Sequence, residues 1–365
     1  MKILLTAWAL VDHSGIPLFT RDLALALRAA GQDVAVYTLR PGAIAAQIAA
    51  AGIAVVTDLD RLPFRPDIIH GQDQPLLANA LHRLKGVPAI GVTHDATSIV
   101  DAPFHHPRIA RYVAVDERCR RRIAADPAIA PERICVILNA VDLDRFRPRP
   151  PLPVKPARAL IFSNYATSRT HLRPVREACE AAGLSVDVAG LGAANLVTAP
   201  EDVLGAYDLI FAKARCALEA MATGAAVVLC DFSGLGPMVS SDNVAALRRM
   251  NFGAGVLTMP LTAQAIAGEI AKYDARDAAL VADIVRREAD LKVSARQWLC
   301  LYRDALADAP REPAGDDAIL GSLDAKWRTF RRLAPLVSLA RRVKSVPVVG
   351  GRLYAAAARV WHRRY

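Results

Sequence analysis

Residues 211–231 read FAKARCALEAMATGAAVVLCD. An apolar strand is predicted over residues 209–212, and a second one over residues 226–230. Between them, residues 216–223 carry a helical pattern that ends at Gly224, a residue type that favours the end of a helix. A strand, a helix and a strand in this order predict a βαβ unit with parallel strands.

The same alternation extends in both directions along the chain, in two arrays. The strands are short apolar runs without polar alternation, which is typical of strands buried on both faces of a parallel sheet. In the first array we expect a helix over residues 17–30 that ends at Gly31, and strands over residues 2–8, 33–39, 53–56, 67–70, 89–93, 112–115 and 134–138. In the second array we expect a helix over residues 170–182 and further strands over residues 159–163 and 185–189. The fold class predicted is α/β, with two Rossmann-like, doubly wound domains that face a cleft.

A proline-rich segment, RPRPPLPVK at residues 147–155, separates the two arrays. Its proline density forbids regular structure and predicts a semi-rigid, extended linker. The expected organisation is a domain over residues 1–147, a linker over 148–156, a second domain over 157–310 and a tail over 311–365.

The composition excludes several classes of protein. The chain has 365 residues, of which 53 % are hydrophobic and 22 % charged, so it has enough apolar residues for two packed cores. No window is long and apolar enough for a membrane-spanning helix, and the N-terminal apolar run is typical of a first strand rather than a signal peptide. The six cysteines lack metal-ligand spacing, so we expect reduced, mostly buried thiols and no metal site.

The positive charge is concentrated at the C-terminus. The net charge is +10, and residues 325–365 contain 11 Lys or Arg and no Asp or Glu, so the rest of the chain is nearly neutral. Nucleic-acid-binding proteins more often carry basic residues on the folded domain, so we expect no nucleic acid partner. The tail combines helically spaced apolar residues with arginines, which favours contact with an anionic membrane surface through residues 325–365. The alternative is that this basic amphipathic helical tail packs across the two domains with its arginines solvated.

Polar residues in the first array follow two of the predicted strands. Ser14 and Gly15 lie just before a helix, whose N–H groups favour an anion, and Gly15 lets a ligand approach closely. An ordinary βα turn is the alternative. His94 ends a buried strand and could share a proton or donate a hydrogen bond, although it could equally be a core histidine. His70 ends its strand in the same way, and its neighbours Gln72 and Asp73 could cap the next helix.

The second array has the denser cluster. Lys213 and Arg215 lie at the turn into a helix, where two cations and unpaired N–H groups suit a diphosphate. Glu219 follows Arg215 by four residues, so it either forms an intrahelical ion pair or accepts two sugar hydroxyls. Gly234 and Gly236 belong to a predicted glycine-rich loop over residues 233–237, which could let the backbone approach a ligand.

Four segments together resemble a known family. They are YVAVDERCRRRIAADPAIAPERICVILNAVDLDRFRP (112–148), LEAMATGAAVVLCD (218–231), DIIHGQD (67–73) and VPAIGVTHD (87–95). In this order they are similar to the motifs of retaining GT-B glycosyltransferases of the family-4 type (glycosyl transferases group 1). The resemblance covers residues 1–308 and implies a nucleotide-sugar donor bound by the second domain and an acceptor bound by the first.

The resemblance also implies roles for single residues. Glu219 matches the glutamate that holds the ribose of the donor, and Lys213 and Arg215 are the candidates for its diphosphate. His94 matches the histidine near the transferred sugar, and Gly15 matches the glycine loop beside the donor phosphates. The candidate catalytic residues are therefore His94 and Glu219. In the matched interdomain signature, Asn139 and Asp142 have a mainly structural role.

The implied reaction moves a hexose-type sugar from a UDP- or GDP-sugar, with retention of configuration, to a glycan or lipid-linked acceptor. Cations and a helix dipole stabilise the leaving group in such a site, so neither a divalent metal nor another cofactor is expected. The enzyme would make cell-surface polysaccharide or glycolipid and would lie in the cytoplasm, peripherally on the inner face of the cell membrane.

Three positions depart from the family pattern. Phe211 stands where the family has a sugar-gripping glutamate, and Ala140 replaces a signature glycine. The loop after the first strand of the second domain offers one candidate cation, Arg169. These departures leave open a degenerate, non-catalytic binding subunit. A sugar-nucleotide epimerase of the same fold is a further alternative, although it has no need of a basic tail.

Overall fold

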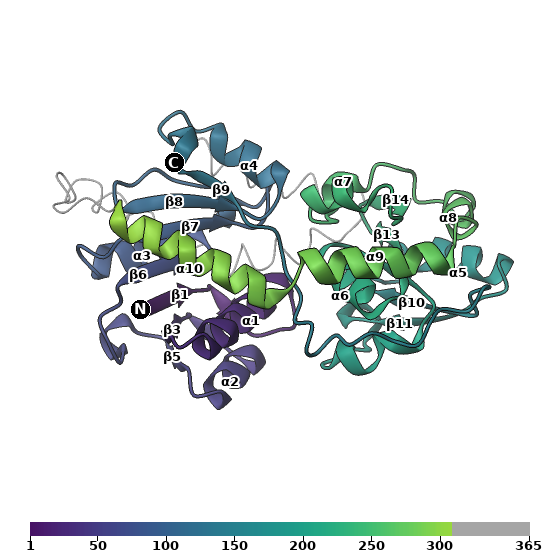
Figure 1. The fold of residues 1–365 in the computed structure, drawn as a ribbon, viewed down its shortest axis with the longest axis horizontal. Coiled ribbons are helices and arrows are strands. Elements are labelled where there is room, and N and C mark those ends of the chain that lie inside the picture. The colour runs from purple at the N-terminus through teal and green to yellow at the C-terminus, as the bar shows by residue number, and fades with distance from the viewer. Residues whose placement is uncertain (309–365) are drawn as a thin grey trace. The chain divides into compact units, whose positions relative to one another are not determined.

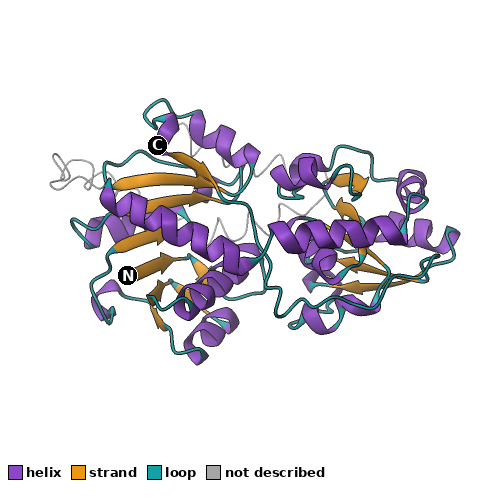
Figure 2. Ribbon diagram, viewed as in Figure 1, coloured by secondary structure: helices purple, strands orange, loops and turns teal. Residues whose placement is uncertain are grey.

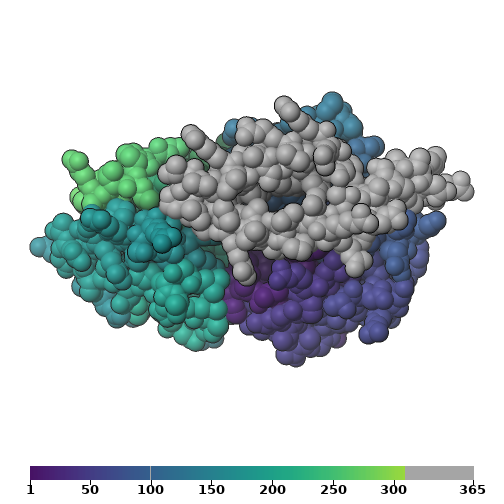
Figure 3. All heavy atoms as spheres, turned by 180° about the vertical axis from the view of Figure 1, so that it is seen from behind, coloured from purple at the N-terminus to yellow at the C-terminus, as the bar shows by residue number. Residues whose placement is uncertain are grey.

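The computed structural model describes residues 1–308, which are coloured in Figure 3. These residues form two compact units. The first consists of Met1–Ile137 and the segment from Leu291 to residue 308, and the second consists of Leu138–Asp290. The predicted tail over residues 311–365, with the stretch 325–365 expected to contact a membrane, lies outside the described residues.

The first unit contains a seven-stranded parallel sheet with helices packed against it (Figures 1 and 2). Its strand order is β5-β3-β1-β6-β7-β8-β9, which places the topological switch point between β1 and β6. The strands are β1 (Lys2–Thr6), β3 (Asp33–Tyr37), β5 (Ala54–Val56), β6 (Ile68–Gly71), β7 (Ala89–Thr93), β8 (Ile109–Ala114) and β9 (Ile134–Val136), and β2 (Ala9–Leu10) pairs separately with β4 (Arg40–Pro41). The helices are α1 (Gly15–Ala29), α2 (Ala43–Ala50), α3 (Gln74–Arg83), α4 (Glu117–Ala124) and α10 (Leu291–Ala307).

Helix α1 follows the sequence pattern closely. It buries Leu23, Ala24 and Leu27 on the face that covers the sheet, as their spacing of one, three and four residues requires. Gly31 adopts a left-handed φ of +77° just after the helix, and its N–H donates to the carbonyl of Arg28. The helix end predicted at Gly31 is therefore confirmed.

Helix α10 belongs to the first unit, although it follows the whole second unit in the chain. It packs against α1 and crosses the sheet near β7 and β8 (Figure 1). Trp298 and Tyr302 of α10 are fully buried in the core of the first unit. The two ends of the described chain are thus held together by burial of apolar surface.

The second unit contains a five-stranded sheet of order β11-β10-β12-β13-β14 (Figure 1). The first four strands in this order are parallel, with a switch point between β10 and β12, and β14 is antiparallel to β13. The strands are β10 (Arg158–Phe162), β11 (Ser185–Ala189), β12 (Leu209–Ala212), β13 (Ala226–Asp231) and β14 (Gly234–Met238). The helices are α5 (Leu172–Ala181), α6 (Ala214–Thr223), α7 (Val244–Arg249), α8 (Ala263–Ile270) and α9 (Ala275–Glu288).

The glycine-rich loop predicted over residues 233–237 is wrong, because this segment forms the edge strand β14. A Cβ atom on Gly234 would lie 2.7 Å from the carbonyl oxygen of Leu257, and Gly234 has a φ of +152°. A Cβ atom on Gly236 would lie 2.9 Å from that of Leu229. Both glycines therefore allow close packing of β14 within the second unit.

The boundaries of the units differ from the predicted ones at residues 147 and 310. The chain leaves the first unit between Ile137 and Leu138 and re-enters it at Leu291. Val141 pairs with Asp290 through a β-bridge, and Phe146 is fully buried in a core of the second unit. These contacts hold the residues before the proline-rich segment on the second unit.

No helix within residues 1–308 has both the length and the apolar character needed to cross a membrane. All six cysteines are free, and Cys119, Cys179 and Cys230 are buried while Cys300 is exposed. Burial raises the pKa of Cys119 well above its usual range and that of Cys179 to about 12, so these two thiols stay protonated and unreactive.

Candidate functional site

Three polar side chains meet at the switch point of the second sheet. Ser163 follows β10, Lys213 follows β12 and Asp231 ends β13, so they come from three adjacent strands. The ammonium of Lys213 forms an ion pair with Asp231, whose side chain is fully buried. Asp231 Oδ1 also accepts hydrogen bonds from the Ser163 hydroxyl (3.4 Å) and from the backbone N–H of Phe232 (2.7 Å). Sequence analysis gave Asp231 no role, because it only follows the strand predicted over residues 226–230.

Lys213 also lies between two aromatic rings. Its Nζ atom is 5.4 Å from the ring centre of Tyr165 and 5.2 Å from that of Phe232, and the two ring centres are 5.1 Å apart. Ring faces attract a cation, so the two rings and Asp231 together hold the ammonium at the edge of the sheet. Lys213 therefore lies at the turn where a diphosphate was predicted to bind, but its positive charge is already compensated by the carboxylate of Asp231.

His171 is a second polar residue that sequence analysis missed. It precedes α5 directly and is fully buried, and neither of its ring nitrogens has a hydrogen-bond partner. Burial lowers the pKa of His171, and this effect outweighs the nearby carboxylate of Asp231, which raises it, while Lys213 lowers it slightly. The imidazole is therefore neutral. No local pattern marked this residue, since its burial depends on the fold of the whole unit.

Arg215 and Glu219 form the intrahelical ion pair that their spacing allows. The distance from Arg215 Nε to Glu219 Oε1 is 2.6 Å, and the Glu219 carboxylate is almost fully buried. No side chain caps the N-terminus of α6 at Lys213, so the helix presents backbone N–H groups there. Ala214, the first residue of α6, has a left-handed φ of +50°, a conformation that costs on the order of 1–2 kcal/mol for a residue with a Cβ.

The remaining predicted ligand residue of the second unit is Arg169. It is exposed in the loop that follows β10, and among the described residues its guanidinium makes no hydrogen bond or ion pair. Arg169 is therefore the predicted cation that is available to a ligand without breaking an existing contact.

The first unit leaves open space at the start of α1. Ser14 is the residue before this helix, and its hydroxyl donates to Asp12 Oδ1 (2.7 Å) and accepts no capping hydrogen bond from the backbone of the helix. Gly15 is exposed, and a Cβ atom on it would meet nothing within 4 Å. Asp73, which was predicted as a cap, accepts a hydrogen bond from the backbone N–H of Leu76 and thereby caps α3.

Four side chains of the first unit form a hydrogen-bonded chain. Tyr302 Oη lies 2.6 Å from His70 Nδ1, and His70 Nε2 lies 2.9 Å from Gln72 Nε2. Gln72 Oε1 in turn lies 2.5 Å from His94 Nε2. His94 also packs edge-on against Phe19, with a ring-centre distance of 5.0 Å. The fold thus brings His70, which lies in β6, together with His94, which directly follows β7, and it connects both to α10.

Burial holds both histidines neutral. It lowers the pKa of His70 to about 3, with a smaller contribution from the neighbouring His94, and it lowers the pKa of His94 to about 4. An imidazole in this state can donate one hydrogen bond and accept another, but it carries no charge at neutral pH.

We expect the first unit to lose stability in mild acid because of His70. In the unfolded chain the imidazole takes up a proton as the pH falls below about 6.5, whereas in the folded chain it does so only near pH 3. The free energy of unfolding therefore falls through this window, by up to about 1.4 kcal/mol per pH unit. Urea unfolding followed by tryptophan fluorescence checks this, because the buried Trp298 lies 4.7 Å from the His70 ring.

The control for this experiment is His70→Asn. Between about pH 7.5 and about pH 5, this variant should lose roughly 2 kcal/mol less than the unaltered protein. Equal losses in the two proteins would show that the acid sensitivity comes from elsewhere.

Asn139 is held through its backbone, and the side chain of Asp142 holds the turn that follows it. The carbonyl of Asn139 accepts a hydrogen bond from Arg248 (3.5 Å). Asp142 Oδ1 accepts from the backbone N–H groups of Asp144 (3.1 Å) and Arg145 (3.3 Å). These contacts agree with a structural role for both residues.

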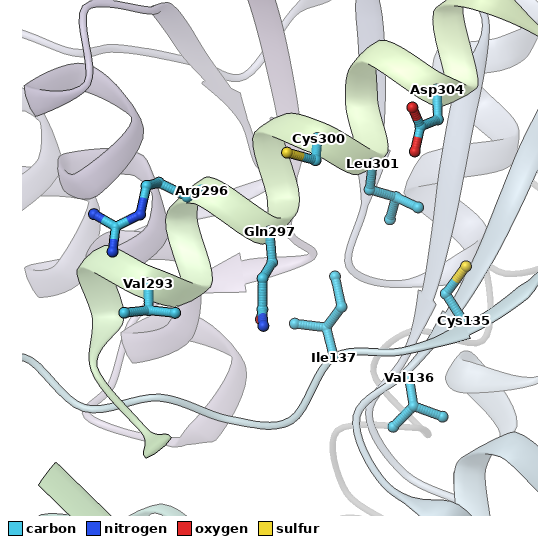
Figure 4. Close-up of a pocket in the computed structure, with 9 residues that line it drawn as sticks. All are labelled: Cys135, Val136, Ile137, Val293, Arg296, Gln297, Cys300, Leu301 and Asp304. Carbon is cyan, nitrogen blue, oxygen red and sulfur yellow. The ribbon is translucent and has the colours of Figure 1, made fainter. Parts of the chain in front are cut away.

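An open pocket of about 510 Å³ lies between the β9 segment and α10 in the first unit. Gln297 and Leu301 of α10 project towards residues 135–137 (Figure 4). None of the predicted site residues lines this pocket, so it is separate from the two candidate clusters. Within the described part of the chain, no group of three His, Cys, Asp or Glu side chains is placed to hold a metal ion.

Comparison with known proteins bears on the first unit and on the fold. Residues 13–145 match the family model described as Glycosyltransferase Family 4, so the resemblance predicted from the motifs is confirmed over these residues. A search of curated proteins finds none that matches the chain.

Several solved structures share the fold. A glycosyltransferase from Rickettsia africae ESF-5 aligns with a TM-score of 0.60 and 16 % identity, over 84 % of this chain and 99 % of that one. The Anabaena protein HepE (Alr3699), in complex with UDP-glucose, aligns with a TM-score of 0.61 and 14 % identity, over 83 % of this chain and all of that one. WaaG, a glycosyltransferase involved in lipopolysaccharide biosynthesis, aligns with a TM-score of 0.51 and 13 % identity, over 82 % and 99 %. At these identities the likeness shows the fold, which is GT-B as predicted.

Proposed function

We propose that this chain is a glycosyltransferase that moves a sugar from a nucleotide-sugar donor to a glycan or lipid-linked acceptor, with retention of configuration. The observation that carries the proposal is the cluster of Lys213, Asp231 and Ser163 beside the uncapped N-terminus of α6, at the switch point of the second sheet. Ligands of doubly wound sheets bind beyond the carboxyl ends of the strands at such a point. The family match over residues 13–145 and the solved HepE complex with UDP-glucose support the same function.

The residues divide the work in this proposal. The N–H groups and dipole of α6, together with Arg169 and Lys213, stabilise the negative charge that develops on the departing nucleoside diphosphate. Glu219 accepts ribose hydroxyls, and His94 of the first unit contacts the transferred sugar. In this proposal, the leaving group is stabilised by the fixed charges of the two cations and by the dipole of the helix.

The finer parts of the proposal concern the sugar, the acceptor and the place of action. A hexose-type sugar and a UDP-linked donor are in keeping with the UDP-glucose complex of HepE, and a GDP-linked donor is the alternative. A surface polysaccharide or glycolipid as product is in keeping with WaaG, which is involved in lipopolysaccharide biosynthesis. Action on the cytoplasmic face of the membrane, with residues 325–365 on its anionic surface, stays a prediction.

Binding of a nucleoside diphosphate is the first test. We expect one of UDP, GDP, ADP and dTDP to raise the melting temperature, because a ligand at 100 times its Kd stabilises a protein by about 2.7 kcal/mol. The matching nucleoside without phosphates is the control and should have little effect. Sugar transfer would then release the free nucleoside diphosphate in step with modification of the acceptor.

A non-catalytic binding subunit is the second candidate. It is favoured by one observation, namely that Lys213 and Arg215 are both paired with carboxylates. Under this alternative, no nucleoside diphosphate raises the melting temperature and none is released in the presence of a donor. Binding of one nucleotide with release of its diphosphate would exclude it.

A further inference from the structure

The orientation of the Gln72 carboxamide in this hydrogen-bonded chain sets where the imidazole hydrogens are. A carboxamide oxygen can only accept, so His94 Nε2 must donate its hydrogen to Gln72 Oε1. The carboxamide nitrogen can only donate, so His70 Nε2 must accept from Gln72 Nε2. The hydrogen of His70 is then on Nδ1, where it is donated to the hydroxyl oxygen of Tyr302. The position of each hydrogen along the chain therefore follows from the position of the one before it.

The members of the chain are enclosed in the core of the first unit. His70, Gln72 and Tyr302 are fully buried. His70 also packs against the Trp298 ring, and His94 packs against Phe19. Breaking one link would leave a buried polar group without a partner, which costs about 1–3 kcal/mol.

The chain also joins distant parts of the sequence. Tyr302 lies on α10 and follows His70 by 232 residues, whereas Gln72 and His94 follow β6 and β7. The position of α10 on the first unit is therefore coupled to the position of the ring hydrogen on His94, the histidine predicted to be catalytic.

We propose that Gln72, oriented by His70 and Tyr302, is a positioning residue that holds His94 with its hydrogen on Nε2 and leaves Nδ1 as a hydrogen-bond acceptor. Within the described part of the chain, no residue donates a hydrogen bond to His94 Nδ1. The ligand group that fits this atom is a hydroxyl donor, as a sugar carries. This role for Nδ1 rests on the proposed function, but the form of the imidazole does not.

Long-range ¹H–¹⁵N spectra of histidine-labelled full-length protein test the form directly, because protonated and unprotonated ring nitrogens resonate far apart. The signals of His94 are identified by their loss in His94→Gln. At neutral pH we expect a neutral ring with its hydrogen on Nε2, without any substrate present. A hydrogen on Nδ1, or a mixture of both forms, in the unaltered protein would overturn the proposal.

Two variants test whether Gln72 sets this form. Gln72→Met keeps the length of the side chain and removes the hydrogen bonds, so His94 should become a mixture of both neutral forms. Gln72→Glu keeps an acceptor for Nε2–H and should restore the single form. The matched control is Gln74→Met, since Gln74 is also buried but donates to the backbone carbonyl of Val92. A single unchanged form in Gln72→Met would overturn the proposal.

The far end of the chain provides a test that does not touch Gln72. Tyr302→Phe removes the acceptor for His70 Nδ1–H, so the carboxamide can reverse and the signals of His94 should again report a mixture. Tyr112→Phe is the control, because Tyr112 is a buried tyrosine of the same unit whose hydroxyl donates to the carbonyl of Phe104. No response of His94 to Tyr302→Phe would show that the coupling does not extend to α10.

Kinetics separate this inference from the proposed function. With an active donor and acceptor pair, Gln72→Met should lower kcat about tenfold, the equivalent of one oriented hydrogen bond, and leave the affinity for the nucleoside diphosphate unchanged. If the protein transfers no sugar, the proposed function fails while the spectra still decide the form of His94. An unchanged kcat in a variant whose spectra show a mixture would remove Nδ1 from the reaction.

Discussion

A Glu219→Gln variant should bind the nucleoside diphosphate about 100-fold more weakly than the unaltered protein. In the proposed donor site the Glu219 carboxylate accepts two ribose hydroxyls, and hydrogen bonds to a charged group are each worth about 1.5–3 kcal/mol. The substitution keeps the shape of the side chain but removes its charge and one acceptor. Isothermal titration of the nucleotide that raises the melting temperature measures the loss.

The second unit provides a matched control, Glu269→Gln. Glu269 is also a nearly buried glutamate on a helix, and it pairs with Lys272 three residues later, where the distance from Lys272 Nζ to Glu269 Oε1 is 2.7 Å. Both variants lose one ion pair, so both should lower the melting temperature. Only Glu219→Gln should lower the affinity. If the two variants bind the nucleotide equally well, Glu219 serves Arg215 alone and has no contact with the donor.

The sequence was most informative where the fold depends on local pattern. The apolar runs that form β1, β6 and β7 were recognisable because a strand that is buried on both faces is apolar along its whole length. Helix α6 was recognisable because its helical pattern ends at Gly224, which has a left-handed φ of +92°. These features are set by neighbours in the chain.

Prediction failed where distant residues decide the structure. Glycines are rare in strands, so residues 233–237 read as a loop. In the fold these glycines lie in β14, where Leu229 and Leu257 come too close to leave room for a Cβ atom. Nothing near α10 in the sequence shows that this helix packs on the first unit.

The candidate sites follow the same division. The positions of Gly15, His94, Lys213 and Glu219 could be found because each follows a strand or lies on a recognisable helix. Their partners could not be found. Asp231 becomes a neighbour of Lys213 through the pairing of β12 with β13, and His171 does so through the fold of the whole unit. Gln72 beside a capping aspartate gives no sign that it connects two histidines.

Lys213→Ala should lower the free energy of unfolding of the second unit by about 3 kcal/mol. The reason is that Asp231 is fully buried and would keep a negative charge without its ion-pair partner. Lys272→Ala is the control, because Lys272 pairs with the nearly buried Glu269 but is itself well exposed, so its loss should cost about 1 kcal/mol or less. Thermal unfolding of both variants without ligand measures the difference.

Asp231→Asn then shows whether Lys213 serves only this pair. The substitution leaves the ammonium between the rings of Tyr165 and Phe232 and removes the carboxylate that competes with a phosphate for it. If Lys213 turns to the diphosphate when the donor binds, the affinity for the nucleoside diphosphate should rise about tenfold, or about 1.4 kcal/mol, and should depend more steeply on salt. An unchanged affinity would mean that Lys213 holds the sheet edge together and that Arg169 and the N-terminus of α6 bind the phosphates without it.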